Sequence, residues 1–443
     1  MSTNFVSTTF KRLISDGVLQ IGDGYRAKLE ELGGDGLIFL RSGNVSDDAI
    51  TFDGVERFHT SLAQKVAQKV SRPSDTIITT KGNSTGRTSY VTDDMPSFVY
   101  SPHLSFWRSK QPYQLHPGFL RYWARGEEFQ EQLREMMGST DMAPYLSLTD
   151  QEMLRISVPG IDQQSVIARI LGALDDKIEL NRRMNRTLKA LAQKLFKSWF
   201  VDFEPVVAKS QGRRPFGLSD ELAALFPSKF EDSDMGPVPR GWRMAPLGDT
   251  LALERDLVEP QQASSEEFDH YSIPAFDRGQ IPTREIGGAI KSGKYRVPDD
   301  ALLLSKLNPD TPRVWWPTTD PAWRAIASTE FLVCRAKPNF NRTWLYWQLR
   351  DSDFLDEFTT RVTGTSNSHQ RVRPDDLLRL LRVDAGEVLR NEFAKLVTAP
   401  TKRMMLNTQQ SQKLAAMRDL LLPKLLSGEL RVPAAEKTIQ AIG

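Results

Sequence analysis

Arginine, lysine, asparagine and glutamine gather in polar loops at matching places in the two halves of the sequence. The loop TKGNSTGR begins at Thr80, the loop SKLNPDTPR begins at Ser305, and the stretch TGTSNSHQRV begins at Thr363. Such side chains carry the donors and acceptors that read base edges, because arginine and lysine fit guanine while asparagine and glutamine fit adenine. The candidate DNA contacts are Arg41, Ser42, Asn44, Lys81, Asn83, Ser84, Thr85 and Arg87 in the first half, and Lys306, Asn308, Thr311, Arg313, Thr365, Ser366, Asn367, His369, Gln370 and Arg371 in the second.

The presence of each of these polar residues can also be explained by an ordinary solvent-exposed turn. Gly82, Gly86 and Pro309 mark turns, whose polar residues commonly face water. For any single residue the turn explanation is favoured. For the loops as a set, contact with DNA is favoured, since both halves place cationic and amide groups there. His369 has no cysteine near it, and its His and Asp neighbours lack metal-ligand spacing, so we interpret it as a polar contact.

The sequence shows no recognisable catalytic motif. The loop TKGNSTGR lacks the Lys-Ser or Lys-Thr end of a phosphate-binding P-loop, and the five histidines are too scattered to assign a Ser-His-Asp set. Cys334 is the single cysteine, which excludes an internal disulfide and a cysteine-based zinc site. We therefore expect a binding protein without metal, cofactor or catalytic residues of its own. Two alternatives stay open: a coiled-coil scaffold that binds only proteins, and a DNA-modifying enzyme with an unrecognised active site.

Length and composition predict a folded chain of several domains. A chain of 443 residues exceeds a single hydrophobic core, so two or three domains are expected. The formal net charge is +2, so any basic surface must be local. No apolar stretch of signal-peptide length opens the sequence, and no run approaches the roughly 20 apolar residues that cross a bilayer. This pattern predicts a cytoplasmic protein.

The chain is a duplication of one unit. The segment SPHLSFWR, which ends at Arg108, aligns with the segment STEFLVCR, which ends at Arg335. Further pairs keep nearly the same separation along the chain: Phe129 with Phe354, Thr140 with Thr365, Asn181 with Asn407, and Leu188 with Leu414. A period this long indicates duplicated domains and not a solenoid of short repeats. Each copy reads as a mixed α and β segment followed by a long helix.

Both long helices carry a heptad row with a central asparagine. In the first helix, residues spaced seven apart form the row Ile167, Leu174, Asn181, Leu188 and Leu195. In the second helix, the matching row is Phe393, Pro400, Asn407, Leu414 and Leu421. A buried asparagine weakens an apolar seam but fixes the register of partner helices. We therefore predict an antiparallel pair in which the two asparagines meet, serving as a rigid spacer. Because proline interrupts helical hydrogen bonding, the second helix should start or kink near Pro400.

The first long helix has a basic outer face and ends in aromatic residues. Phe196, Trp199 and Phe200 lie in the closing stretch KLFKSWF. Aromatic side chains at a helix end suit a surface on which a partner docks. The alternative is that they cap the helix pair or pack on the following linker. The sequence does not separate these two readings.

Several stretches resemble the specificity subunit of Type I restriction–modification systems. The segment RISVPGIDQQSVIARILGALDDKIELNRRMNRTLKALAQKLFKSWFVDFEPV is similar to the central conserved region of that family, and LLPKLLSGEL followed by RV is similar to its C-terminal signature. The loops TKGNSTGR and TGTSNSHQRVRPDDL resemble parts of its target-recognition domains. The likeness covers the chain from about residue 35. The second half opens with GPVPRGWRMAPLGDTLAL, as such a domain usually does, whereas the segment 1–24 departs from that pattern and looks like a short helix and turn.

The resemblance implies an α+β fold with two pseudo-repeated mixed α/β target-recognition domains separated by an antiparallel coiled coil of two long helices. It implies a non-catalytic subunit whose domains each read half of a split target in double-stranded DNA. It also implies two modification subunits, which carry S-adenosylmethionine, and two restriction subunits as partners. The expected segments are recognition domains at 1–155 and 236–384, long helices at 156–204 and 385–430, a linker at 205–235 and a tail at 431–443.

Overall fold

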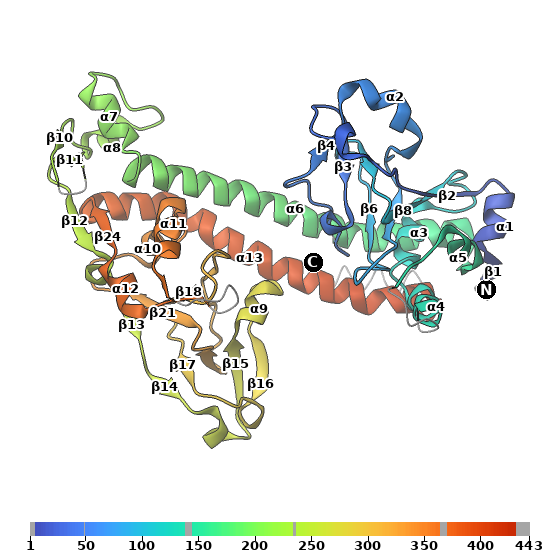
Figure 1. Cartoon of the computed structure of the whole chain (residues 1–443). Coiled ribbons are helices and arrows are strands. Elements are labelled where there is room, and N and C mark those ends of the chain that lie inside the picture. The colour runs from blue at the N-terminus through green and yellow to red at the C-terminus, as the bar shows by residue number, and fades with distance from the viewer. Residues whose placement is uncertain (1–4, 48, 138–143, 234–235, 364–369, 431–443) are drawn as a thin grey trace. The chain divides into compact units, whose positions relative to one another are not determined.

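The computed structural model describes residues 5–47, 49–137, 144–233, 236–363 and 370–430, and the chain divides into two compact units. Unit 1 contains residues 1–179 and 413–443, and unit 2 contains residues 180–412. Two helices of 40 residues each, α6 (Ile161–Phe200) and α13 (Glu387–Leu426), contribute one part to each unit (Figure 1). Among the described residues, no helix is long and apolar enough to span a membrane.

Two small sheets form the globular part of unit 1. The first has the order β2-β8-β5-β6 and is antiparallel throughout. The second has the order β4-β3-β7, with β3 parallel to β7. Short β-branched and aromatic runs such as TIIT and FVY suit strands buried on both faces. The strands are β2 (Leu19–Asp23), β3 (Ile38–Leu40), β4 (Glu56–Arg57), β5 (Thr76–Thr79), β6 (Thr88–Tyr90), β7 (Phe98–Tyr100) and β8 (Leu104–Ser109).

Helices pack the first sheet of unit 1 against the long helices. Trp107, Trp123 and Phe129 form an aromatic core that continues onto Leu171 of α6 and Leu425 of α13. Capping defines the short helices: Ser147 accepts a hydrogen bond from the Asp150 backbone N–H in a capping box before α5. The helices are α1 (Phe10–Ser15), α2 (Ala63–Val66), α3 (Pro117–Trp123), α4 (Glu127–Met137) and α5 (Leu148–Met153), with 3-10 turns at Leu29–Glu31, Ser42–Asn44, Thr60–Leu62 and Ala67–Lys69.

Unit 2 repeats this arrangement with a larger second sheet. Its first sheet has the order β13-β21-β18-β19, and its second has the order β14-β17-β20-β15-β16 with β15 parallel to β20. The strands are β13 (Leu251–Glu254), β14 (Leu257–Val258), β15 (Glu267–Tyr271), β16 (Thr283–Ile286), β17 (Lys294–Arg296), β18 (Ala301–Ser305), β19 (Val314–Trp315), β20 (Arg324–Ala327) and β21 (Phe331–Ala336). The two-stranded pairs are β10 (Phe230–Glu231) with β11 (Val238–Pro239), and β22 (Val362–Thr363) with β23 (Arg371–Val372).

Helices again cover the first sheet of unit 2. The core joins Leu302 and Leu332 of that sheet to Trp344 and Leu345 of α10 and to Phe393 of α13. Asn341 and Asp351 cap the starts of α10 and α11 by accepting backbone N–H groups. The helices are α7 (Glu204–Ser210), α8 (Asp220–Ala224), α9 (Ile273–Asp277), α10 (Arg342–Gln348), α11 (Ser352–Thr360) and α12 (Pro374–Arg379), with 3-10 turns at Leu247–Asp249, Pro260–Ala263 and Gly287–Ala289.

The predicted duplication and mixed fold are confirmed strand by strand. The first sheets share one strand order, and β8 (104–109) maps onto β21 (331–336) in the same alignment that pairs Arg108 with Arg335 in the sequence. Each second sheet pairs its equivalent strands, β3 with β7 and β15 with β20, in parallel. Backbone pairing has therefore been kept in both copies while the side chains have diverged.

The start of the chain also follows the repeat, which corrects the expectation of a helix and turn alone over the segment 1–24. Strand β1 (Val6–Thr9) pairs antiparallel with β9 (Arg155–Val158), and β12 (Arg243–Pro246) pairs antiparallel with β24 (Leu381–Asp384) in the same way. A short helix, α1, does lie between β1 and β2. Each copy thus closes its ends with a two-stranded ribbon just before its long helix. Backbone pairing needs no particular side chains, so the sequence around β1 hides this equivalence.

The long helices pair antiparallel, as predicted. In unit 1, Leu171 and Leu174 from the first part of α6 share a core with Leu421 and Leu425 from the last part of α13. In unit 2, the last part of α6 packs on the first part of α13, where the rings of Phe196 and Phe393 lie 5.5 Å apart. A straight helix of this length extends about 60 Å.

We predicted that the second long helix starts or kinks near Pro400, and the first of these two outcomes is wrong. The helix begins at Glu387 and continues through Pro400 to Leu426. Proline removes the backbone donor that would bond to Leu396 O. The rest of the turn keeps further contacts, since Thr398 Oγ1 donates to Ala394 O at 2.6 Å and Thr401 Oγ1 donates to Val397 O at 2.7 Å. Val397 and Thr401 are also buried on the neighbouring structure. Tertiary packing therefore outweighs the local cost of the proline.

Candidate nucleic-acid interface

The loop between β5 and β6 is a tight hairpin that presents polar side chains. Its ends are joined by the Thr79 N–H, which donates to Arg87 O at 2.9 Å. Gly82 and Gly86 adopt positive φ of 81° and 93°, which favours glycine. Lys81, Asn83 and Arg87 are exposed, whereas Ser84 and Thr85 are partly buried. Thr85 Oγ1 donates to Gly82 O at 2.7 Å and so braces the loop.

The loop between β18 and β19 has the same frame. The Ser305 N–H donates to Arg313 O at 2.9 Å, at positions equivalent to Thr79 and Arg87. Asn308 takes the place of Gly82 and also has positive φ, at 47°. Lys306 and Asn308 are partly buried, and Thr311 is exposed.

A second segment of each copy lies against its hairpin. In unit 1, the Gly82 N–H donates to Pro144 O at 3.0 Å, and the Leu146 N–H donates to Thr80 O at 2.9 Å. In unit 2, the equivalent bonds run from Asn308 N–H to Gln370 O at 2.9 Å and from Val372 N–H to Lys306 O at 3.0 Å. The structure therefore brings Gln370 and Arg371 to the predicted loop of the second copy. Thr365, Ser366, Asn367 and His369 lie outside the described residues.

The cationic candidates differ in their partners. Arg313 forms a two-pronged ion pair with Asp277 at 2.8 and 3.0 Å, and Arg371 forms one with Glu330 at 2.9 Å for both bonds. The hydrogen bond to Glu330 raises the pKa of Arg371 above its ordinary value. Across the described parts of the chain, Lys81, Arg87 and Lys306 have no carboxylate within ion-pair distance. These three are the cations most available to an external anion.

Arg41, Ser42 and Asn44 belong to a different part of unit 1. They form a 3-10 turn after β3, in which Asn44 Oδ1 accepts from the Arg41 backbone N–H at 3.2 Å. The Arg41 guanidinium pairs with Glu56 and lies over the Phe39 ring at 5.0 Å. Ser42 and Asn44 are partly exposed. Reading a base with Arg41 would require it to exchange Glu56 for that base.

The predicted asparagine register is present in the helix pair of unit 2. Asn181 Nδ2 donates to Gln410 Oε1 at 3.0 Å and lies 3.4 Å from Asn407 O. Asn407 Nδ2 donates to Asn185 Oδ1 at 2.9 Å. Asn181 and Asn407 are 0% and 1% exposed, so their amides depend on these partners. Asn185 was not foreseen, although its place four residues after Asn181 sets it on the same face.

The prediction that Phe196, Trp199 and Phe200 form a docking surface is wrong for the folded chain. Their exposed fractions are 4%, 1% and 5%. They pack into the core of unit 2 with Phe226 and Trp242, which follow α6 in the sequence, and with α10 and α13. The alternative reading, in which these rings pack on the linker and close the helix pair, describes the structure.

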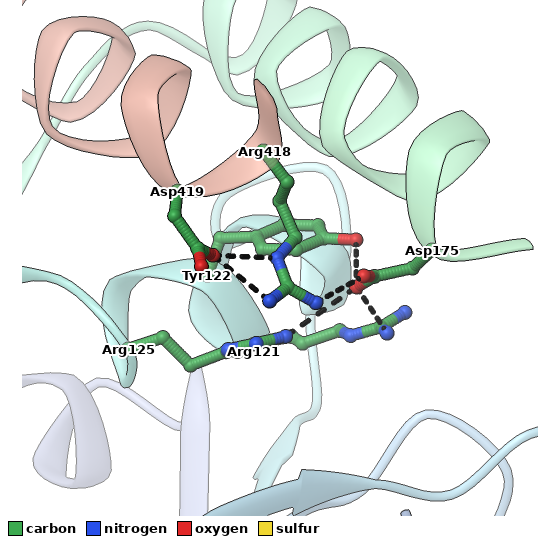
Figure 2. A network of polar contacts seen from close by, with 6 residues as sticks. All are labelled: Arg121, Tyr122, Arg125, Asp175, Arg418 and Asp419. Atoms are coloured by element: carbon green, nitrogen blue, oxygen red, sulfur yellow. Dashed lines mark hydrogen bonds and ion pairs between the residues drawn. The ribbon is translucent and has the colours of Figure 1, made fainter. Parts of the chain in front are cut away.

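A buried ionic cluster, not foreseen from the sequence, joins the two long helices in unit 1 (Figure 2). Asp175 of α6 accepts from Arg418 of α13 at 2.8 Å and from Arg121 at 2.6 Å. The Tyr122 hydroxyl donates to Asp175 Oδ2 at 2.9 Å, and Arg125 lies 3.4 Å from it. Asp175 and Arg418 are 9% and 5% exposed. A sequence signal existed, since Asp175 stands four residues after Leu171 on the apolar face.

The charges of this cluster make unit 1 sensitive to acid. Burial alone raises the pKa of Asp175, but Arg121, Arg418 and Arg125 together lower it below its ordinary value. A carboxylate with a lowered pKa stabilises the fold at pH values above its pKa in the unfolded chain. That stability is lost as the pH falls through the lowered pKa, which lies below the ordinary range of about 3.9.

The described residues contain no metal-binding cluster, and their single cysteine is buried. No cluster of three or more histidine, cysteine, aspartate or glutamate residues with metal-binding geometry occurs among them. Cys334 is buried, and burial raises the pKa of its thiol to about 12. A thiol with this pKa stays protonated near neutral pH and is a poor nucleophile.

Comparisons of sequence and of structure find the same group of known proteins. A family model described as "Type I restriction modification DNA specificity domain" matches residues 17–190. The chain is 24% identical to the Type I restriction enzyme HindI specificity subunit of Haemophilus influenzae, over 89% of this chain and 94% of that protein. It is 25% identical to the MjaIX specificity subunit of Methanocaldococcus jannaschii, over 71% of this chain and 69% of that protein. The crystal structure of a Type-I restriction-modification system S subunit from M. genitalium has the same fold, with a TM-score of 0.57, 14% identity and 96% coverage of both chains.

The two loop glycines provide a matched test of the hairpin. A Cβ on Gly86 would lie 2.1 Å from Leu133 Cδ2, whereas a Cβ on Gly82 would meet nothing within 4 Å. Both residues have positive φ. We expect Gly82→Ala to reduce the free energy of unfolding by about 1 kcal/mol through backbone strain alone, and Gly86→Ala to reduce it by about 3 kcal/mol because overpacking is added. Chemical denaturation measures both changes, and equal losses would contradict the described position of Leu133.

The ionic cluster is tested by Asp175→Asn, with the exposed neighbour Asp176→Asn as control. Removing one buried charge leaves its arginine partners uncompensated, so we expect Asp175→Asn to reduce the free energy of unfolding by about 3 kcal/mol at neutral pH. The difference from the unsubstituted chain should shrink as the pH falls below about 4, where protonation removes the same charge. A loss that is independent of pH, or shared by Asp176→Asn, would refute this role.

Proposed function

We propose, from the premise that this chain belongs to the DNA specificity subunits of Type I restriction–modification systems, that each mixed α/β domain reads one half of a split target in double-stranded DNA. Family membership rests on the family model and on the two specificity subunits to which the chain is similar. Such subunits are the non-catalytic DNA-recognition components of a larger complex, in which catalysis lies with partner subunits. The chain itself is therefore a binding subunit and not an enzyme.

The observation that carries the proposal is the shared hairpin frame with altered side chains. The same backbone hydrogen bonds hold the loops at Thr80–Arg87 and Lys306–Arg313, each against a second segment. Within that frame, Gly82, Asn83 and Ser84 are replaced by Asn308, Pro309 and Asp310. Side chains on one frame that differ between copies suit two different half-sites, because base edges are read by side-chain donors and acceptors.

The proposed assembly contains two modification subunits and two restriction subunits. The modification subunits would carry S-adenosylmethionine and methylate adenine, so this chain would need no cofactor. We propose readers at 1–155 and 236–384, long helices at 156–204 and 385–430, and a linker at 205–235. The helix pair would set the gap between half-sites and dock the modification subunits. A cytoplasmic location follows from this role, since the target is cellular or incoming DNA.

The test is a genome-wide map of methylated adenines after co-expression of the chain with its modification subunit. We expect a split motif with a fixed gap. Lys81→Gln with Arg87→Gln should relax the first half-site only, and Lys306→Gln the second only. Loss of a good base contact costs about 1–3 kcal/mol of discrimination.

Lys11→Gln serves as the control, because Lys11 is an exposed cation on α1 outside the loops. It should leave the motif unchanged. A continuous motif, or loop variants that alter both half-sites together, would contradict the assignment of one reader to each half. A protein-only scaffold would give no motif, and its binding would depend little on salt.

A further inference from the structure

Unit 2 contains a concave pocket of about 450 Å³ between the helix pair, α10, strand β19, the end of β15 and the segment between α9 and β16. Four cationic residues line it: Arg182, Arg186 and Lys189 of α6, and Arg350 just after α10. The rings of Trp316 and Tyr346 form part of its wall. Among the described residues that line the pocket, none is acidic. Its size is in the range of small-ligand sites.

The duplication shows why this pocket lacks a carboxylate. In the alignment of the two copies, Arg125 of the first copy corresponds to Arg350, and Asp175 corresponds to Thr401. The aromatic contact is retained, because Tyr122 OH donates to Asp175 at 2.9 Å and Trp347 Nε1 donates to Thr401 Oγ1 at 2.9 Å. The counter-ion is not retained.

Arg350 is consequently held by neutral oxygens. Its Nη1 donates to the Tyr346 hydroxyl at 2.8 Å and to Val314 O at 3.3 Å. Arg125, its equivalent, lies 3.4 Å from the Asp175 carboxylate. The first copy therefore supplies an internal anion for this arginine, and the second copy does not.

Lys189 is the cation of the pocket that the charge of Arg350 affects. The pKa of Lys189 is lowered, first by burial and then by the charge of Arg350. The walls are tied together, since Gln412 Nε2 donates to Gly279 O at 2.8 Å and Gln193 Nε2 donates to Arg350 O at 3.1 Å. The site is thus preformed, and an anion would relieve the repulsion between Lys189 and Arg350.

We propose that this pocket binds a phosphate of the DNA backbone beside the half-site that unit 2 reads. This inference rests on the proposed function and adds a positioning contact to it. Arginine and lysine are the usual partners of backbone phosphates, and such contacts fix the register of a protein on its duplex. In the second copy, the phosphate would supply the negative charge that Asp175 supplies in the first.

The decisive variant is Thr401→Asp, which copies the first half of the chain into the second. The new carboxylate should accept from Trp347 and pair with Arg350, so the protein should stay folded with an unchanged or higher unfolding midpoint. It should also bind a duplex without any target sequence more weakly, with a salt slope reduced by about 1, as for one lost phosphate contact. Thr187→Asp is the matched control, because Thr187 is exposed on α6 outside the pocket.

Removal of positive charge gives a second, independent arm. Arg186→Gln with Lys189→Gln should weaken duplex binding and reduce the salt slope by about 2. Lys194→Gln with Lys402→Gln removes the same charge from exposed positions outside the pocket and should change binding little. This arm decides the question should Thr401→Asp fail to fold.

The outcomes separate this inference from the proposed function. The pocket's role would be overturned if the folded pocket variants bind duplex DNA with the same affinity as the unsubstituted chain. It would also be overturned if their affinity equals that of the control variants. Thermal protection by AMP or inorganic phosphate, without any change in duplex binding by the variants, would assign the pocket to a free nucleotide and also overturn it. If the unsubstituted chain shows no preference for any target sequence, the proposed function is refuted instead.

Discussion

The buried polar contacts between α6 and α13 are the constraint on which the rest of the structure depends. A buried amide or charge costs free energy unless its partner is in place. In unit 2, Asn181 donates to Gln410 and Asn407 donates to Asn185, and in unit 1 Asp175 accepts from Arg418. Sliding one helix along the other would leave these groups without partners. The apolar seam supplies the attraction, and these few polar groups select one antiparallel register.

Duplication followed by divergence explains both the fold and its asymmetry. The strand orders and hairpin hydrogen bonds are the same in the two copies, because backbone pairing tolerates changes of side chain. The places where the copies differ are then informative. Asp175 is matched by Thr401 and Arg418 by Ala192, so one end of the helix pair is held by buried ions and the other by aromatic and neutral contacts.

The sequence predicted those features that repeat or follow a heptad, and missed those that depend on distant packing. The asparagine register could be foreseen because position in a heptad determines which face a residue occupies. Burial of Phe196 could not, since its partners Phe393 and Trp344 are far away in the sequence. Pro400 misled because tertiary contacts outweigh a local preference. Of the candidate DNA contacts, Gln370 and Arg371 lie beside the hairpin of their own copy, but the carboxylate partners of Arg41, Arg313 and Arg371 become visible only in the fold.

Under the proposed function, the length of the paired helices would set the spacing between two dissimilar readers. Duplicating one heptad in each helix, residues 179–185 in α6 and residues 405–411 in α13, preserves the apolar seam and repeats the asparagine layer. Seven residues add about 10 Å of helix, which corresponds to about three base pairs of duplex. The map of methylated adenines should then show both half-sites unchanged and a gap longer by about that amount. An unchanged gap, or altered half-sites, would contradict the account.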